Sequence, residues 1–96
     1  MSLKIKDLKP HMENVTLIAK VIQKSEPTWV GIDKKKYSSA IVEDETGRIK
    51  LNLWREQVEQ VKEGDVVKIS SAFVHIRNQI LQISTWSSIQ TIGHEK

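Results

Sequence analysis

The sequence lacks cysteine entirely, and this excludes disulfide bonds and thiolate metal ligands. Its three histidines, His11, His75 and His94, lie far apart in the chain, with no metal-ligand spacing and no nucleophile–base pair. The four glycines are scattered, so they form no glycine-rich phosphate loop. From these absences we expect a protein that is not an enzyme and that uses neither a metal ion nor a cofactor.

Long apolar runs are absent as well. The opening segment MSLKIKDLKP does not resemble a signal peptide, and no stretch approaches the ~20 apolar residues that a membrane-spanning helix needs. The lack of cysteine is compatible with a reducing compartment. We therefore expect a soluble, cytoplasmic protein that does not contact a membrane.

A chain of 96 residues is long enough for one modest core and should bury roughly 65% of its unfolded surface. We expect a single domain over residues 1–96, with residues 1–12 as a lead-in interrupted by Pro10 and residues 93–96 as a frayed tail. The acidic residues 43–45 fall between two expected strands. They are better interpreted as a solvated turn than as a metal site.

The excess of positive charge lies in the first half of the chain. Residues 1–50 hold ten Lys or Arg against seven Asp or Glu, whereas residues 51–96 hold five of each, so the first half accounts for the net charge of +3. A basic run occurs at Lys34, Lys35 and Lys36. This distribution is compatible with a nucleic-acid partner and equally with a surface that only maintains solubility.

Alternation of apolar and polar residues predicts β-structure through most of the chain. The only convincing helix is 55–64, where Val58 and Val61 form a narrow apolar stripe and Gly64 provides the stop. The small residues 70–72 predict a bulge or sharp bend in the strand after the helix. The expected strands are 14–24, 37–44, 47–54, 65–76 and 80–86, with 25–36 as a loop or a hairpin tip.

Five strands with one short helix between the third and the fourth is the layout of an all-β OB-fold, a five-stranded Greek-key barrel. The helix would plug one end of the barrel, for which a narrow apolar stripe suffices. An SH3-like barrel is the main competing architecture, but it usually lacks a full helix at that point.

The strand GRIKLNLW, residues 47–54, places its aliphatic residues on one face and Arg48, Lys50, Asn52 and Trp54 on the other. An outward tryptophan beside cations exposes apolar area unless something covers it. One interpretation is that Trp54 packs over the helix on Val58. The other is a platform on which unpaired bases stack while the cations contact phosphates.

Two further aromatic residues fit the same outward pattern, each with an alternative. Phe73 follows the expected bend with His75 and Arg77 at the same parity, although it would enter the core if the bulge shifted that parity. Trp86 lies opposite in parity to the apolar residues of its strand; the alternative is that it caps the open end of the barrel. Trp29, in the long loop, either closes over a ligand or forms a lid on the barrel.

At this point the chain resembles a known family. The segments IKDLKPHMENV, SSAIVEDETGRIKLNLW, VKEGDVVKISSAFV and QILQIS are similar to those of archaeal single-stranded-DNA-binding proteins with an OB-fold of the replication protein A type. The resemblance covers about residues 3–92. It implies that aromatic residues at Trp54 and Phe73 stack on bases. A third family aromatic falls near Arg77, where this chain departs from the pattern and where Trp86 is a candidate substitute.

The resemblance implies sequence-tolerant binding of single-stranded DNA in replication, recombination and repair, and it leaves single-stranded RNA open as a second ligand. We expect Trp54 and Phe73 to stack bases, Arg48, Lys50 and Arg77 to meet phosphates, and Asn52 to reach a base edge. The loop residues Trp29, Lys34, Lys35 and Lys36 would close over the strand, with His75 and Trp86 nearby. We expect a monomer when free, with replication or repair proteins as further partners. The alternatives are a protein-interaction OB module of a larger complex and a module that binds transfer RNA.

Overall fold

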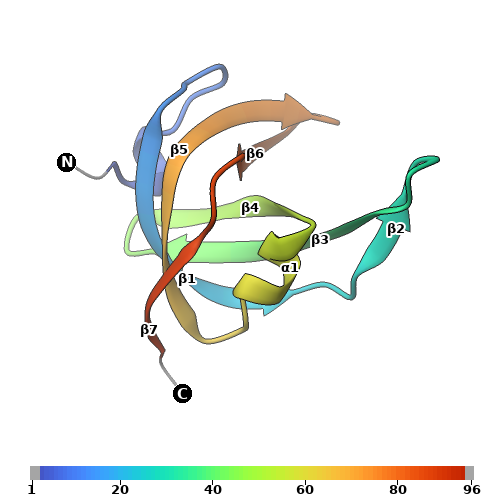
Figure 1. The fold of residues 1–96 in the computed structure, drawn as a ribbon. Helices are drawn as coiled ribbons and strands as arrows, with labels where there is room; N and C mark the ends of the chain where they lie inside the picture. Colours follow the sequence, from blue (N-terminus) through green and yellow to red (C-terminus); the bar gives the residue numbers. More distant parts are fainter. Residues whose placement is uncertain (1–2, 95–96) are drawn as a thin grey trace.

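Five strands close into a ring in the computed structural model of the chain, which describes residues 3–94 (Figure 1). The order around the ring is β1-β3-β4-β6-β5, and β5 pairs back to β1. All of these pairings are antiparallel except the parallel one between β4 and β6. The ring confirms the predicted five-stranded barrel. Its strands are β1 (Val15–Lys24), β3 (Lys35–Asp44), β4 (Gly47–Trp54), β5 (Asp65–Arg77) and β6 (Ile80–Thr85).

The barrel interior is filled by aliphatic residues at alternate positions of these strands, as the sequence pattern predicts. Leu17, Leu51, Leu53, Ile69 and Ile83 all have an exposed fraction of 0%. Each such side chain contributes about 1.5–3 kcal/mol through its removal from water. Because the core uses these branched side chains, the outer face of the sheet is left to carry the rings and the cations.

The predicted bend in β5 is a bulge. Val15 and Leu17 of β1 are two residues apart, but their partners on β5, Ala72 and Ile69, are three residues apart. Ser71, within this step, has a φ of 52°. The extra residue changes which positions point inward, so Val74 is 2% exposed while Phe73 lies on the outer face. The bulge does shift the parity, but the shift turns Phe73 outward, so the expectation that a parity shift would bring this ring into the core is wrong.

Helix α1 (Glu56–Gln60) lies between β4 and β5, which are the third and fourth ring strands in chain order. It is shorter than the predicted 55–64, because Val61 already has extended backbone angles of φ −121° and ψ 129°. Val58 and Val61 are both buried, at 1% and 0% exposed, and they join the core cluster. No helix within residues 3–94 has both the length and the apolar content to span a membrane.

Two short strands lie outside the ring. Strand β2 (Thr28–Val30) pairs with the start of β3, and this hairpin extends well beyond the barrel (Figure 1). Strand β7 (Gln90–His94) pairs with β5, so Gly93 and His94 lie in a strand and not in a frayed tail, while residues 95–96 lie outside the described part. The described part of the lead-in, residues 3–12, contains one 3-10 turn, η1 (Ile5–Asp7).

Candidate nucleic-acid interface

One wall of the candidate site comes from β3 and β4. Tyr37 and Trp54 are direct cross-strand partners, and their ring centroids lie 4.5 Å apart at a tilt of 53°. Both rings point outward because their positions alternate with the buried residues of the same strands. Trp54 thus packs against Tyr37 on the outer face, which differs from the interpretation that it folds over the helix.

The opposite wall comes from β5 and the segment after β6. Phe73 and Trp86 stack with their centroids 5.7 Å apart and their planes at 29°, and Phe73 also contacts the ring of His75 at 5.7 Å. Trp86 directly follows the last residue of β6 and is 86% exposed. A ring this exposed covers little of the barrel end, so Trp86 does not serve as the cap that was one of its two interpretations.

A cavity of about 220 Å³ separates the two walls, and we call it the stacking slot. Its walls are the Tyr37–Trp54 and Phe73–Trp86 pairs, and its floor includes Asn52, Ser84 and Thr85. A planar ring placed here would contact aromatic side chains of both pairs. The slot therefore has the shape and the chemistry to stack a flat aromatic ligand.

The polar residues of the floor are bonded to one another. Asn52 is 5% exposed: its Oδ1 accepts a hydrogen bond from the Tyr37 hydroxyl at 2.6 Å, and its Nδ2 donates to Gln82 Oε1 at 2.8 Å and to Ser84 Oγ at 3.1 Å. Ser84 Oγ also lies 2.9 Å from His75 Nε2. Burial raises the pKa of Tyr37, against an opposing effect of Arg77, so its hydroxyl remains a donor. Asn52 thus fixes the slot floor, and its amide already has three partners.

Gln57, on helix α1, forms hydrogen bonds to the backbone of both walls. It is 7% exposed, and its Oε1 accepts a hydrogen bond from the Trp54 backbone N–H at 3.0 Å. Its Nε2 donates to the carbonyls of Thr85 at 2.7 Å and of Ser87 at 2.8 Å. These two carbonyls flank Trp86 in the chain. One buried side chain therefore fixes the backbone on both sides of the slot.

Two further cavities adjoin the slot and share Trp54 with it. The hairpin cleft, of about 830 Å³, is lined by residues of the β2–β3 hairpin, by Lys35 and Arg55, and by Trp54 and Trp86. The cationic pocket, of about 370 Å³, is lined by Lys50 and Arg77 together with Tyr37, Trp54 and Gln82. We call the slot and these two cavities the binding groove.

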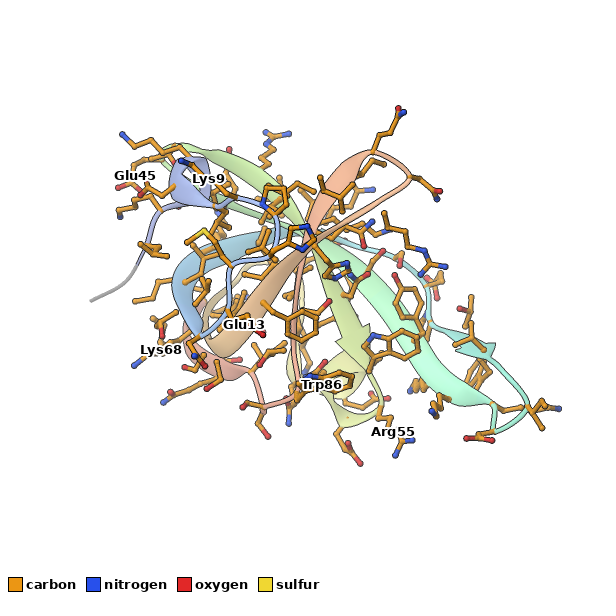
Figure 2. All side chains as sticks on the ribbon, turned by 90° about the horizontal axis from the view of Figure 1, so that it is seen from above. Lys9, Glu13, Glu45, Arg55, Lys68 and Trp86 are labelled. Carbon is orange, nitrogen blue, oxygen red and sulfur yellow. The ribbon has the colours of Figure 1, made fainter. Side chains whose placement is uncertain are left out.

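Four cations thus lie around the aromatic walls of the binding groove: Lys35, Lys50, Arg55 and Arg77. Of these, Lys35 also forms an ion pair, with its Nζ 3.8 Å from Asp33 Oδ2. Figure 2 shows Trp86 and Arg55 close together, while Lys9 and Glu45 lie toward the opposite end of the molecule. Aromatic faces bordered by cations are suited to a ligand that is both planar and anionic.

The structure separates several predicted site residues from this groove. Trp29 is 61% exposed and pairs with Lys36 on the hairpin, at the parity opposite to Val30 and Lys35, which line the cleft. Lys36 forms an ion pair with Glu59 of helix α1, and this hydrogen bond lowers the pKa of Glu59. Trp29 and Lys36 therefore face away from the groove.

Arg48 and Lys34 also lie away from the aromatic walls. Arg48 is six residues before Trp54 on β4, a separation of about 20 Å along a strand, and its Nε lies 3.4 Å from Glu43 Oε1. Lys34 is at the hairpin tip with a φ of 51° and is exposed.

The acidic turn at residues 43–45 has a structural role. Asp44 accepts hydrogen bonds from the backbone N–H of Ile5 at 2.8 Å and from the Thr46 N–H and hydroxyl at 2.7 and 2.5 Å. Burial alone would raise the pKa of Asp44, but these hydrogen bonds outweigh it and hold the pKa below its usual value. Glu45 forms an ion pair with Lys4 at 2.9 Å. Within residues 3–94 no group of three or more candidate ligands could hold a metal ion.

Sequence reasoning missed part of the groove. It assigned no orientation to Tyr37 and did not single out Arg55, Gln57 or Gln82. The position of Arg55, immediately after Trp54, was an available signal for a rim cation. No local pattern marks Gln57 or Gln82, because their roles depend on partners about 30 positions away.

Comparison with known proteins identifies the chain's relatives. A family profile described as "Single-stranded DNA binding protein Ssb-like, OB fold" matches residues 8–91. The single-stranded DNA binding protein Ssb of Saccharolobus solfataricus is 43% identical over 75 residues, which cover 76% of this chain and 51% of that protein. The chain therefore spans about half the length of this curated relative.

Solved structures give the same result. A crystal structure of a domain of replication protein A from Methanococcus maripaludis matches with a TM-score of 0.81 and 27% identity, covering 98% of both chains. The solution structure of the second OB-fold domain of replication protein A from the same organism matches with a TM-score of 0.81 and 28% identity, covering 100% of this chain and 99% of that one. The family is one of binding proteins and not of enzymes. From the extent of the profile match and the identity to Ssb, the chain belongs to the Ssb-like OB-fold family of single-stranded DNA binding proteins.

Proposed function

We propose that this protein binds single-stranded DNA with little sequence preference and protects it during replication, recombination and repair. The observation that carries the proposal is the stacking slot, a cavity of about 220 Å³ between the Tyr37–Trp54 and Phe73–Trp86 pairs. Stacking of a base on an aromatic side chain is worth about 1–3 kcal/mol and does not depend on which base it is.

The floor of the slot supports low sequence preference. Asn52 and Ser84 hydrogen-bond to each other, and Asn52 also bonds to Tyr37. A floor whose polar groups are already paired discriminates weakly between base edges, because few donors and acceptors are left unpaired when a different base enters.

The cations around the groove supply the attraction for the sugar-phosphate backbone. Lys35 and Arg55 border the hairpin cleft, while Lys50 and Arg77 border the cationic pocket. With one phosphate at each cation, the logarithm of affinity should fall with the logarithm of salt concentration with a slope of about −2.8, at −0.7 per phosphate. Bases in a duplex are paired and stacked already, so a duplex should bind far more weakly.

The experiment is a titration of intrinsic tryptophan fluorescence with oligothymidine, compared with a duplex of equal length. We expect quenching by the single strand alone, because Trp54 and Trp86 line the slot. Trp54→Ala should weaken binding about 5- to 150-fold, which corresponds to the loss of one stacked base. The matched control is Trp29→Ala, which removes a tryptophan that faces away from the groove.

Absence of quenching at low salt would overturn the proposal. Equal losses of affinity in Trp54→Ala and Trp29→Ala would place the ligand elsewhere on the protein. A Trp54→Ala protein that keeps full affinity for DNA would instead favour the alternative in which the outward rings contact a protein partner.

A further inference from the structure

One buried side chain on the groove face has donors without a protein partner. Gln82 is 3% exposed and lies between Lys50 of β4 and His75 of β5 in the sheet register. Its Oε1 accepts a hydrogen bond from Asn52 Nδ2 at 2.8 Å. Within residues 3–94, no hydrogen bond joins Gln82 Nε2 to another residue, while Gln82 lines the cationic pocket. Its two N–H groups are thus held in a groove wall with nothing from the protein to receive them.

The orientation of this amide follows from its neighbours. The Tyr37 hydroxyl donates to Asn52 Oδ1, which leaves Asn52 Nδ2 to donate toward Gln82 and Ser84. In this arrangement Gln82 turns its oxygen toward Asn52, which leaves its nitrogen for the pocket. A buried amide that is fixed in this way discriminates between ligands more sharply than a surface glutamine, because a mismatched ligand leaves its donors unpaired.

The cationic pocket presents donors from several side chains. Lys50 and Arg77 are donors only, and Gln82 adds the two N–H groups of Nε2, while the exposed Asn78 carries both donors and an acceptor, so donors predominate. An exocyclic carbonyl of a base matches such a lining, whereas an exocyclic amine brings a donor against donors. Thymine, uracil and guanine carry a carbonyl where adenine carries an amine.

We propose that Gln82 is a specificity-determining residue that donates a hydrogen bond to an exocyclic carbonyl of a base in the cationic pocket, so that carbonyl-bearing bases bind more tightly than adenine. This inference rests on the proposed binding of single-stranded DNA and adds one selective position to a groove that is otherwise tolerant. The expected preference is about 2- to 10-fold, the range of one neutral hydrogen bond.

The test compares short homopolymers of deoxyinosine and deoxyadenosine of equal length. Their bases have the same purine ring system and differ at position 6, where hypoxanthine has a carbonyl and adenine an amine, and at N1, which carries a hydrogen only in hypoxanthine. The variant Gln82→Met keeps the side-chain length without its donors. Gln82→Glu keeps an oxygen for Asn52 but replaces the donors by acceptor oxygens. Gln23→Glu, at an exposed position of β1, controls for the added charge.

We expect the wild type and Gln23→Glu to bind the inosine strand about 2- to 10-fold more tightly than the adenosine strand. The ratio of the two affinities should fall to about one in Gln82→Met and to one or below in Gln82→Glu. A cooperative thermal unfolding transition shows that each variant is folded. A wild-type ratio of one, or an unchanged ratio in a folded Gln82 variant, overturns this inference and leaves the proposed function intact. If the wild type binds no single strand at all, the proposed function fails and the inference fails with it.

Discussion

Arg77 offers a quantitative test of how the groove holds the DNA backbone. It is the exposed last residue of β5, and it lines the cationic pocket with Tyr37, Lys50 and Trp54. If it neutralises one phosphate, Arg77→Gln removes about 0.7 from the salt slope, which falls from about −2.8 to about −2.1. A tenfold reduction in salt concentration should then enlarge the affinity difference between wild type and variant about fivefold, or by ~1 kcal/mol.

The assay is the affinity for oligothymidine at several salt concentrations, measured by fluorescence anisotropy of a labelled strand. The matched control is Arg48→Gln, which removes the same charge from the outer face of β4 but far from Trp54 and beside Glu43. The control should keep the wild-type slope. Equal changes of slope in the two variants would refute the reasoning, because general surface charge would then account for the attraction.

Three further predictions concern the elements that support the groove. Arg55 has φ 56° and ψ −121°, a region that favours glycine. Arg55→Gly should raise the free energy of unfolding by roughly 1 kcal/mol in urea denaturation while it weakens DNA binding; a loss of stability would contradict this. Gln57→Met removes the three hydrogen bonds of a buried side chain and should lower the free energy of unfolding by about 1–3 kcal/mol and reduce the quenching by DNA; unchanged values of both would argue against its role in linking the two walls. Because the pKa of Asp44 is lowered in the folded state, its contribution to stability is present above the unfolded pKa of about 4 and is lost as the pH falls through the folded pKa. Asp44→Asn should therefore weaken the pH dependence of urea unfolding in that acidic range, and an identical pH profile would count against the assignment.

Local patterns predicted the barrel because they report which face of each strand is apolar. Leu51 and Leu53 alternate with polar residues in the sequence and are fully buried, and the small residues near Ser71 form the expected bulge. The same patterns did not predict β7, because Gly93 and polar neighbours weaken its local preference for strand and its pairing partner on β5 supplies the stability. Pairing, and not propensity, makes this segment a strand.

The aromatic residues of the site could be predicted from the sequence, but their arrangement in space could not. Strand parity alone placed Trp54 on the outer face. The direction of Trp29 required the register of β2 on β3, which the sequence of a loop does not reveal. The bond between Asn52 and Gln82 joins residues 30 positions apart through the parallel pairing of β4 with β6. Side-chain partners of this kind emerge only once the barrel is closed.

The most direct test of the central claim uses the indole N–H signals of the three tryptophans in a nitrogen-15 correlation spectrum. On addition of oligothymidine, the signals of Trp54 and Trp86 should shift strongly, because both rings line the stacking slot, while that of Trp29 should move little. Single substitutions to phenylalanine assign the three signals. A spectrum in which Trp29 shifts most, or in which Trp54 and Trp86 stay in place while DNA binds, would contradict the account.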